Sequence, residues 1–174
     1  MNSTRWTLAI AAAVALAFFT VLVGIPFMTT TLSDGVASYS QGNFSKAYKE
    51  LKPLADDGEP TAQYMMGEMF RMGQGVKKDE VTAFKWYKKA AEGGSPEGQY
   101  ALGMCYATGV GTEVDMIGAY QWLSLAIIRL ASWQNERRTL AAETRAKLLT
   151  VMDQSDVEKA KALVLTWDRK FGGS

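Results

Sequence analysis

The chain has 174 residues, the length of one domain of ordinary size, and its 19 Lys and Arg residues nearly balance its 18 Asp and Glu residues. A charge this close to neutral does not favour nucleic acid as a partner. The absence of histidine excludes Ser-His-Asp and Cys-His nucleophiles and imidazole metal sites, and the single cysteine, Cys105, excludes a disulfide framework. The composition therefore predicts a protein without a cofactor, a metal site or a catalytic centre.

The N-terminal segment is apolar. Residues 6–28 contain no charged side chain, Arg5 precedes them, and the next charge is Asp34. A bilayer core about 30 Å thick needs roughly 20 apolar residues in a helix, and this run is long enough. Positive charge on its N-terminal side places the N-terminus in the cytoplasm and the later residues across the membrane. The run is therefore predicted to be an uncleaved, membrane-spanning signal anchor.

A cleaved secretory signal is the alternative interpretation. The apolar region of such a signal has about 7–15 residues, which is shorter than this run. The cleavage site at residues 31–33 is poor in sequence. The one at 35–37 is better, but cleavage there would remove the start of the first predicted repeat helix. We therefore favour the anchor, and a soluble secreted protein remains the alternative.

The rest of the chain contains a repeat with an offset of 36 residues. Pro60-Thr-Ala-Gln-Tyr-Met-Met-Gly67 returns as Pro96-Glu-Gly-Gln-Tyr-Ala-Leu-Gly103, and Trp86 returns as Trp122. Repeats of this length are typical of solenoid proteins. The pattern defines a half unit and two full units: 34–58, 60–94 and 96–131.

Each full unit is predicted to form an antiparallel pair of helices. The first helix of the first full unit covers about residues 60–71, and Gly73 and Gly75 end it because glycine readily adopts a positive φ. The second helix follows Asp79, a favourable N-cap residue. A helix pair cannot bury its own apolar face, so successive units stack. The second helix directs four residues inward: Ala83, Trp86, Tyr87 and Ala90.

These residues resemble the Sel-one-like repeat (SLR) family, relatives of the tetratricopeptide repeat. The resemblance covers about residues 35–131 and implies an α-solenoid that binds other proteins, often in bacterial envelope assembly or regulation. It places the anchor in a bacterial inner membrane, with residues 34–174 in the periplasm. The positions that carry it are Ala62-Gln-Tyr64, Gly67, Phe70, Gly73, Gly75, Asp79, Ala83, Trp86-Tyr87 and Ala90-Ala91.

The predicted fold class is all-α, in three parts. Residues 1–33 form a cytoplasmic tip, a transmembrane helix and a linker, residues 34–134 form the repeat solenoid, and residues 135–174 form a capping helix pair. The last helix is expected to begin at the capping box Ser155-Asp-Val-Glu158. It carries an apolar stripe expected to cover the end of the solenoid: Val157, Ala160, Val164, Trp167 and Phe171.

The first helices of such repeats line the concave side of the solenoid, so this side is the predicted binding surface. Its tyrosine and arginine residues are of types favoured at binding hot spots. Packing is the alternative role for Tyr64 and Tyr100, which recur at the repeat offset. Glu68 and Arg71 lie outside the apolar set and are expected to matter for binding and not for folding. The candidate partner-binding residues are Thr61, Tyr64, Glu68, Arg71, Met72, Glu97, Tyr100 and Met104, continued by Ala107 and Thr108.

The sequence thus predicts a non-enzymatic adaptor or accessory subunit of a membrane or periplasmic complex. Its partners would be another protein and, through residues 6–28, the lipid bilayer, but not nucleic acid or a small-molecule substrate. One alternative is a soluble periplasmic regulatory protein released by signal cleavage. The other is a carboxylate-dependent hydrolase, which would need two acids facing one cleft, and no such pair recurs at the repeat offset.

Overall fold

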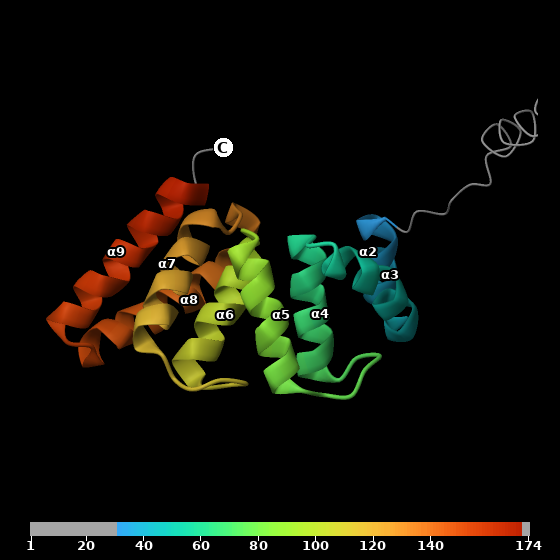
Figure 1. The fold of residues 1–174 in the computed structure, drawn as a ribbon, viewed down its shortest axis with the longest axis horizontal. Coiled ribbons are helices and arrows are strands. Elements are labelled where there is room, and N and C mark those ends of the chain that lie inside the picture. The colour runs from blue at the N-terminus through green and yellow to red at the C-terminus, as the bar shows by residue number, and fades with distance from the viewer. Residues whose placement is uncertain (1–30, 172–174) are drawn as a thin grey trace, which may run out of the picture. The chain divides into compact units, whose positions relative to one another are not determined.

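The computed structural model describes residues 31–171, which fold into helices without a strand. The predicted transmembrane segment, residues 6–28, lies outside this range. Among the described residues, no helix combines the length and the apolar character needed to cross a membrane. In chain order (Figure 1) the elements are α2 (Leu32–Ser40), α3 (Phe44–Asp56), α4 (Pro60–Met72), α5 (Glu80–Glu92), α6 (Pro96–Thr108), α7 (Met116–Arg129), the 3-10 helix η1 (Ser132–Gln134), α8 (Asn135–Val151) and α9 (Gln154–Phe171).

Consecutive helices form pairs that stack in a row. α2 packs on α3, α4 on α5 and α6 on α7, and the second helix of each pair packs on the first helix of the next. The predicted helix-pair solenoid is therefore confirmed. The segment predicted as a half unit forms a pair of its own, α2 with α3, whose first helix is shorter than those of the later pairs.

The helix ends follow the local signals in the sequence. α4 and α6 end at Gly73 and Gly109, which adopt left-handed backbone with φ values of 71° and 73°. Asp79 caps α5, because its carboxylate accepts hydrogen bonds from the backbone N–H groups of Val81 and Thr82. Asp115 caps α7 in the same way, through the N–H of Gly118.

The second glycine of each Gly-x-Gly loop joins neighbouring repeats. Gly75 and Gly111 both have a φ of +72°. A Cβ atom on Gly75 would lie 2.7 Å from the carbonyl group of Phe44, and one on Gly111 would lie 2.1 Å from the carbonyl oxygen of Glu80. Phe44 and Glu80 begin the second helices of the preceding pairs. Each loop therefore packs against backbone where no side chain fits.

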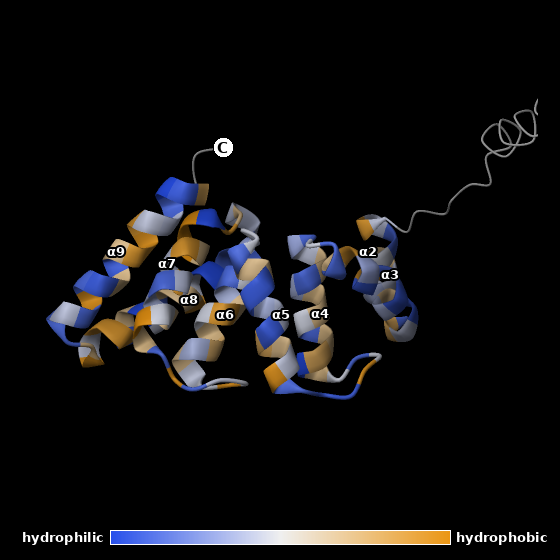
Figure 2. Cartoon of the chain, in the orientation of Figure 1, coloured by the Kyte–Doolittle hydropathy of each residue, from blue (hydrophilic) through white to orange (hydrophobic). Residues whose placement is uncertain are grey.

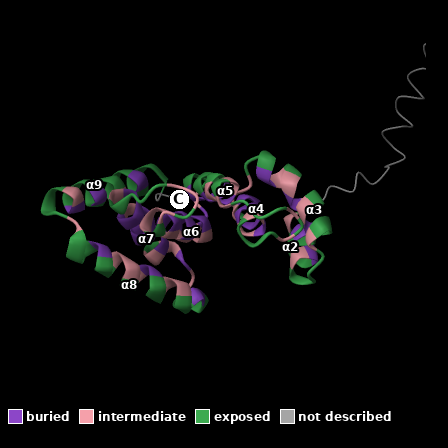
Figure 3. Ribbon diagram, turned by 90° about the horizontal axis from the view of Figure 1, so that it is seen from below, coloured by how far each residue is buried: buried purple, intermediate pink, exposed green. Residues whose placement is uncertain are grey.

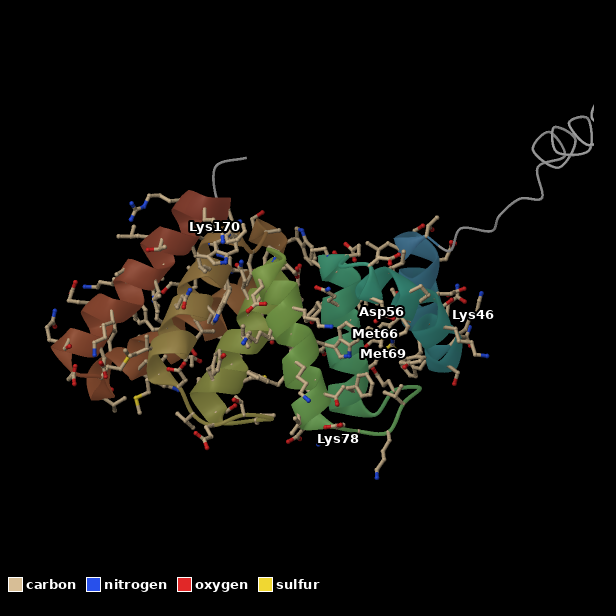
Figure 4. All side chains as sticks on the ribbon, in the orientation of Figure 1. Lys46, Asp56, Met66, Met69, Lys78 and Lys170 are labelled. Carbon is tan, nitrogen blue, oxygen red and sulfur yellow. The ribbon has the colours of Figure 1, made fainter. Side chains whose placement is uncertain are left out.

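The core lies between and within the helix pairs. Figure 3 shows the buried residues along the helix faces that meet, and Figure 2 shows hydrophobic and hydrophilic residues interleaved along each helix. Met66 and Met69 are fully buried against the α2–α3 pair, whereas Lys46 points to solvent (Figure 4). All four residues predicted to point inward from α5 are buried: Ala83, Trp86, Tyr87 and Ala90.

Small residues permit the close contact within each pair. A Cβ atom on Gly67 would lie 2.4 Å from the ring of Tyr87, and one on Gly103 would lie 2.8 Å from Cγ of Leu123. These distances are shorter than side-chain atoms tolerate. The first helix of each pair therefore packs its backbone directly on a large side chain of the second.

The buried glutamines Gln63 and Gln99 occupy the same place in successive repeats but differ in hydrogen bonding. The Gln63 side-chain amide donates to the carbonyl oxygen of Ala55 at 3.0 Å. Gln99 is completely buried, and neither its Nε2 nor its Oε1 atom has a partner among the described residues. A buried polar group without a partner opposes folding.

We expect Gln99→Met to raise the free energy of unfolding by about 1–2 kcal/mol, because it removes two unpaired polar groups at nearly constant side-chain length. Gln63→Met is the matched control. It removes an existing hydrogen bond and should lower the free energy of unfolding by about 1 kcal/mol. Urea unfolding followed by circular dichroism measures both values. Changes of the same sign in the two variants would contradict this interpretation of Gln99.

The C-terminal cap differs from the predicted helix pair. α8 and α9 diverge from the turn that joins them (Figure 3), and both pack on α7 rather than on each other. The predicted stripe does cover the solenoid end: Val157, Ala160 and Trp167 are buried against it. Of the other two stripe residues, Val164 is half-buried against the same core, and Phe171 is 44% exposed.

The predicted start of the last helix is wrong by about two residues. α9 begins at Gln154, and the carboxylate of Asp153 accepts a 2.8 Å hydrogen bond from the backbone N–H of Asp156. Asp153 therefore takes the capping role that the sequence assigned to Ser155. Both residue types cap helices well, so sequence spacing alone did not distinguish them.

Candidate protein-binding site

A cleft opens over the first helices of the repeats. α4 and α6 lie side by side, and α8 lies against α6 and continues their row. The cleft has a volume of about 350 Å³. Its lining comes from Tyr64, Glu68 and Arg71 of α4, Tyr87 of α5, Tyr100, Ala101, Met104, Cys105 and Thr108 of α6, Val110 of the following loop, and Arg137 of α8.

Most of the predicted binding residues meet in this cleft. The structure brings six of them together: Tyr64, Glu68, Arg71, Tyr100, Met104 and Thr108.

The other four predicted residues do not line the cleft: Thr61, Met72, Glu97 and Ala107. Thr61 and Met72 are exposed in the first and last turns of α4. Glu97, in the first turn of α6, accepts a 2.7 Å hydrogen bond from the side-chain amide of Gln134 and so ties α6 to η1. The cleft extends to the last turns of α4 and α6, where Arg71 and Thr108 lie.

The cleft floor contains a hydrogen-bonded network of Glu68, Arg71 and Tyr87. The Tyr87 hydroxyl donates to Oε1 of Glu68 at 2.5 Å, and Arg71 donates to both carboxylate oxygens of Glu68 through Nη2 at 2.7 Å and Nε at 3.2 Å. Burial, together with the Glu68 carboxylate, raises the pKa of Tyr87 far above its usual value, so the hydroxyl remains a donor.

This network corrects the expectation that Glu68 and Arg71 matter only for binding. Tyr87 is 1% exposed, and its hydroxyl reaches the cleft from the core of the α4–α5 pair. Glu68 satisfies that hydroxyl and therefore also contributes to folding. The hydrogen bond to Glu68 raises the pKa of Arg71, which remains a cation paired with that carboxylate.

The upper part of the cleft combines aromatic rings with a second arginine. The rings of Tyr64 and Tyr87 lie 6.1 Å apart between centroids, and the guanidinium carbon of Arg137 lies 5.8 Å from the centroid of Tyr64. Burial raises the pKa of Tyr64 to about 12. Its hydroxyl is therefore neutral at physiological pH. An aromatic face beside a cation is a surface suited to recognition.

The cleft lining contains one carboxylate and one thiol, those of Glu68 and Cys105. Glu68 is the one carboxylate in its lining, and its oxygens are engaged by Arg71 and Tyr87. Burial raises the pKa of the Cys105 thiol to about 11, so it is protonated and a poor nucleophile. Within residues 31–171 no cluster of acidic and cysteine side chains is able to hold a metal ion.

The sequence did not assign Tyr87 and Arg137 to the site, for different reasons. Tyr87 was correctly placed in the core, but its apolar neighbours gave no sign that the hydroxyl passes between the helices. Arg137 lies in α8, beyond the last repeat, where no repeat offset indicates which residue faces the concave side. Its position follows from the way α8 packs on α6 and α7.

Comparison with known proteins agrees with this architecture. The family model of the Sel1 repeat matches residues 60–95 and 96–128. The chain belongs to the Sel1 repeat family, as the resemblance to the Sel-one-like repeat predicted. Sel1 repeat proteins are generally scaffolds for protein interaction and are typically non-catalytic. No curated protein matches the sequence.

Two solved structures are similar to this chain. One is a protective antigen of uropathogenic Escherichia coli with an SLR fold; it is 28% identical, with a TM-score of 0.68 and coverage of 80% of this chain and 29% of the antigen. This chain therefore corresponds to less than a third of the antigen's length. The other is a Sel1 repeat protein from Oxalobacter formigenes, which is 30% identical, with a TM-score of 0.49. The match covers 62% of this chain and 96% of that protein.

Proposed function

We propose that this protein is a membrane-tethered adaptor or accessory subunit of a bacterial envelope complex, and that it binds a protein partner in the cleft between α4, α6 and α8. The observation that carries the proposal is the composition of that cleft. Tyr64, Tyr100 and Arg137 border a recess of about 350 Å³ on the side of the solenoid formed by first helices. Tyrosine and arginine are the residue types that most often dominate binding energy when they border a pocket.

The size of the cleft indicates how the partner binds. A volume of about 350 Å³ holds a few side chains but not a whole helix. The partner therefore inserts anchoring side chains between α4 and α8, while the surrounding helix faces exclude water from the contact.

Tethering is supported by the apolar run 6–28 and by Arg5 before it. The proposed topology has the N-terminus in the cytoplasm and the repeats in the periplasm. An alkaline phosphatase fused after Ser174 should be active. An inactive phosphatase fusion, together with an active cytoplasmic reporter at the same position, would contradict the topology. A mature protein that lacks residues 1–33 by intact mass would instead support the soluble secreted alternative.

The binding proposal is tested with two matched threonines. Thr108 lines the cleft, and its hydroxyl donates to the carbonyl of Met104; Thr166 is also exposed, on α9, and its hydroxyl donates to the carbonyl of Ala162. Thr108→Arg places a bulky cation in the cleft and should reduce recovery of the partner from solubilised membranes by about tenfold or more, a loss of about 1.4 kcal/mol.

Thr166→Arg is the control and should recover the partner as the parent protein does, because it introduces the same side chain outside the cleft. Quantitative mass spectrometry of the captured proteins measures both variants, and thermal unfolding confirms that both fold. Equal recovery by Thr108→Arg and the parent would exclude the cleft as the binding surface.

A further inference from the structure

We infer that the cleft recognises an acidic side chain of the partner and that Arg137 is the cation that pairs with it. This inference rests on the proposed function and specifies the chemistry of the segment that binds.

The balance of charge in the cleft leaves one cation uncompensated. Two guanidinium groups, those of Arg71 and Arg137, face one carboxylate, that of Glu68. Arg71 binds both oxygens of Glu68, so these two charges neutralise each other. Within residues 31–171, Arg137 takes part in no ion pair. The cleft therefore carries a net positive charge located on Arg137.

The acidic residues near the cleft do not cancel this charge. Glu97 and Glu136 act on the tyrosines of the cleft through their charges, but neither lines it. Glu97 is held by the side-chain amide of Gln134, and Glu136 is exposed to solvent. Solvent weakens the effect of an exposed charge, whereas the half-buried Arg137 is less screened.

Arg137 is positioned to bind a carboxylate. Its guanidinium lies over the ring of Tyr64, a contact that uses its charge and not its N–H groups. No described residue accepts a hydrogen bond from it. Its donors are therefore available in the planar arrangement that matches the two oxygens of a carboxylate.

The groups beside Arg137 indicate which kind of residue lies next to the acidic residue in the bound segment. The Tyr64 hydroxyl is neutral and able to donate a hydrogen bond, and the Tyr100 ring and the Met104 side chain provide apolar contact. The segment recognised is therefore an acidic residue next to an aromatic or aliphatic residue. The cleft is partly open to solvent, which leaves room for an extended chain to pass over it.

The test uses the full-length protein in nanodiscs of phosphatidylcholine and a library of random heptapeptides displayed with both ends joined to carrier protein. Peptides retained by the parent protein are sequenced, synthesised with blocked ends and titrated. We expect them to contain Asp or Glu beside an aromatic or aliphatic residue. Replacing that acid by its amide should weaken binding about tenfold.

Arg137→Gln should weaken binding of the acidic peptide by the same factor, and the amide peptide should bind this variant no more weakly than it binds the parent. If Arg137 had a purely structural role, its replacement would weaken the acidic and the amide peptide alike. Arg138→Gln, at the next position of α8 and outside the cleft, is the matched control and should bind as the parent does. A higher salt concentration should weaken binding of the acidic peptide more than binding of the amide peptide.

The outcomes distinguish this inference from the proposed function. Retained peptides without an acid, or undiminished binding by Arg137→Gln, would overturn the inference. If peptides bind Thr108→Arg as tightly as the parent, or if none is retained, the proposed function itself fails.

Discussion

Trp86→Ala is expected to lower the free energy of unfolding by about 3–5 kcal/mol, the range for truncation of a buried tryptophan. Trp86 is 9% exposed and lies on α5, in the core cluster that joins the α4–α5 pair to the preceding one. It contacts a region built from Leu51, Ala55 and Met69, and Lys89 covers its ring at 4.4 Å. Domains of this size have a free energy of unfolding of about 5–15 kcal/mol, so the substitution removes a large fraction of the total stability.

Trp133→Ala is the matched control for this experiment. The Trp133 side chain is 81% exposed in η1, and its removal should change the free energy of unfolding by no more than about 0.5 kcal/mol. Urea unfolding measures the free energy of unfolding of both variants. The comparison requires that this free energy depends on urea concentration with the same slope in both. Equal stabilities for Trp86→Ala and Trp133→Ala would mean that the packing between repeats described above is wrong.

Gly111→Ala is expected to lower the free energy of unfolding by about 2–5 kcal/mol for two reasons. A left-handed backbone costs a residue with a Cβ atom about 1–2 kcal/mol, and the new Cβ would lie 2.1 Å from the carbonyl oxygen of Glu80. The loop would have to move away from α5, and overpacking of this kind costs about 1–3 kcal/mol more.

Gly94→Ala separates these two contributions. Gly94 also has a positive φ, of 91°, but a Cβ atom there would meet nothing within 4 Å. Gly94→Ala should therefore lower the free energy of unfolding only by the cost of a left-handed backbone for alanine, about 1–2 kcal/mol. If both variants lose the same stability in thermal or urea unfolding, the contact between the loop and the preceding helix does not stabilise the solenoid.

The repeats could be predicted because their signals are local and occur twice. Gly73 and Gly109 end helices, Asp79 and Asp115 begin them, and Gly67 permits close packing, each through the chemistry of one residue at a known offset. Because the same apolar positions recur after 36 residues, the sequence also indicates which helix faces pack against each other. The fold of residues 32–129 therefore followed from the sequence, except that the segment predicted as a half unit forms a pair of its own, α2 with α3.

The C-terminal helices and part of the cleft could not be predicted in the same way. α8 and α9 lie beyond the repeats, so no offset indicates that they diverge around α7. The place of Arg137 over Tyr64 depends on how α8 packs on α6 and α7. Likewise, the route of the Tyr87 hydroxyl to Glu68 is a property of two packed helices and not of either helix alone.

The most direct test of the cleft as the partner-binding surface is photo-cross-linking in intact cells of the native host. A benzophenone amino acid is introduced at position 108, within the cleft, or at position 166, at the exposed position of α9. We predict an adduct of one defined mass from position 108 that is absent from position 166. A specific adduct from position 166, with none from position 108, would contradict the proposal and assign partner binding to the C-terminal helices.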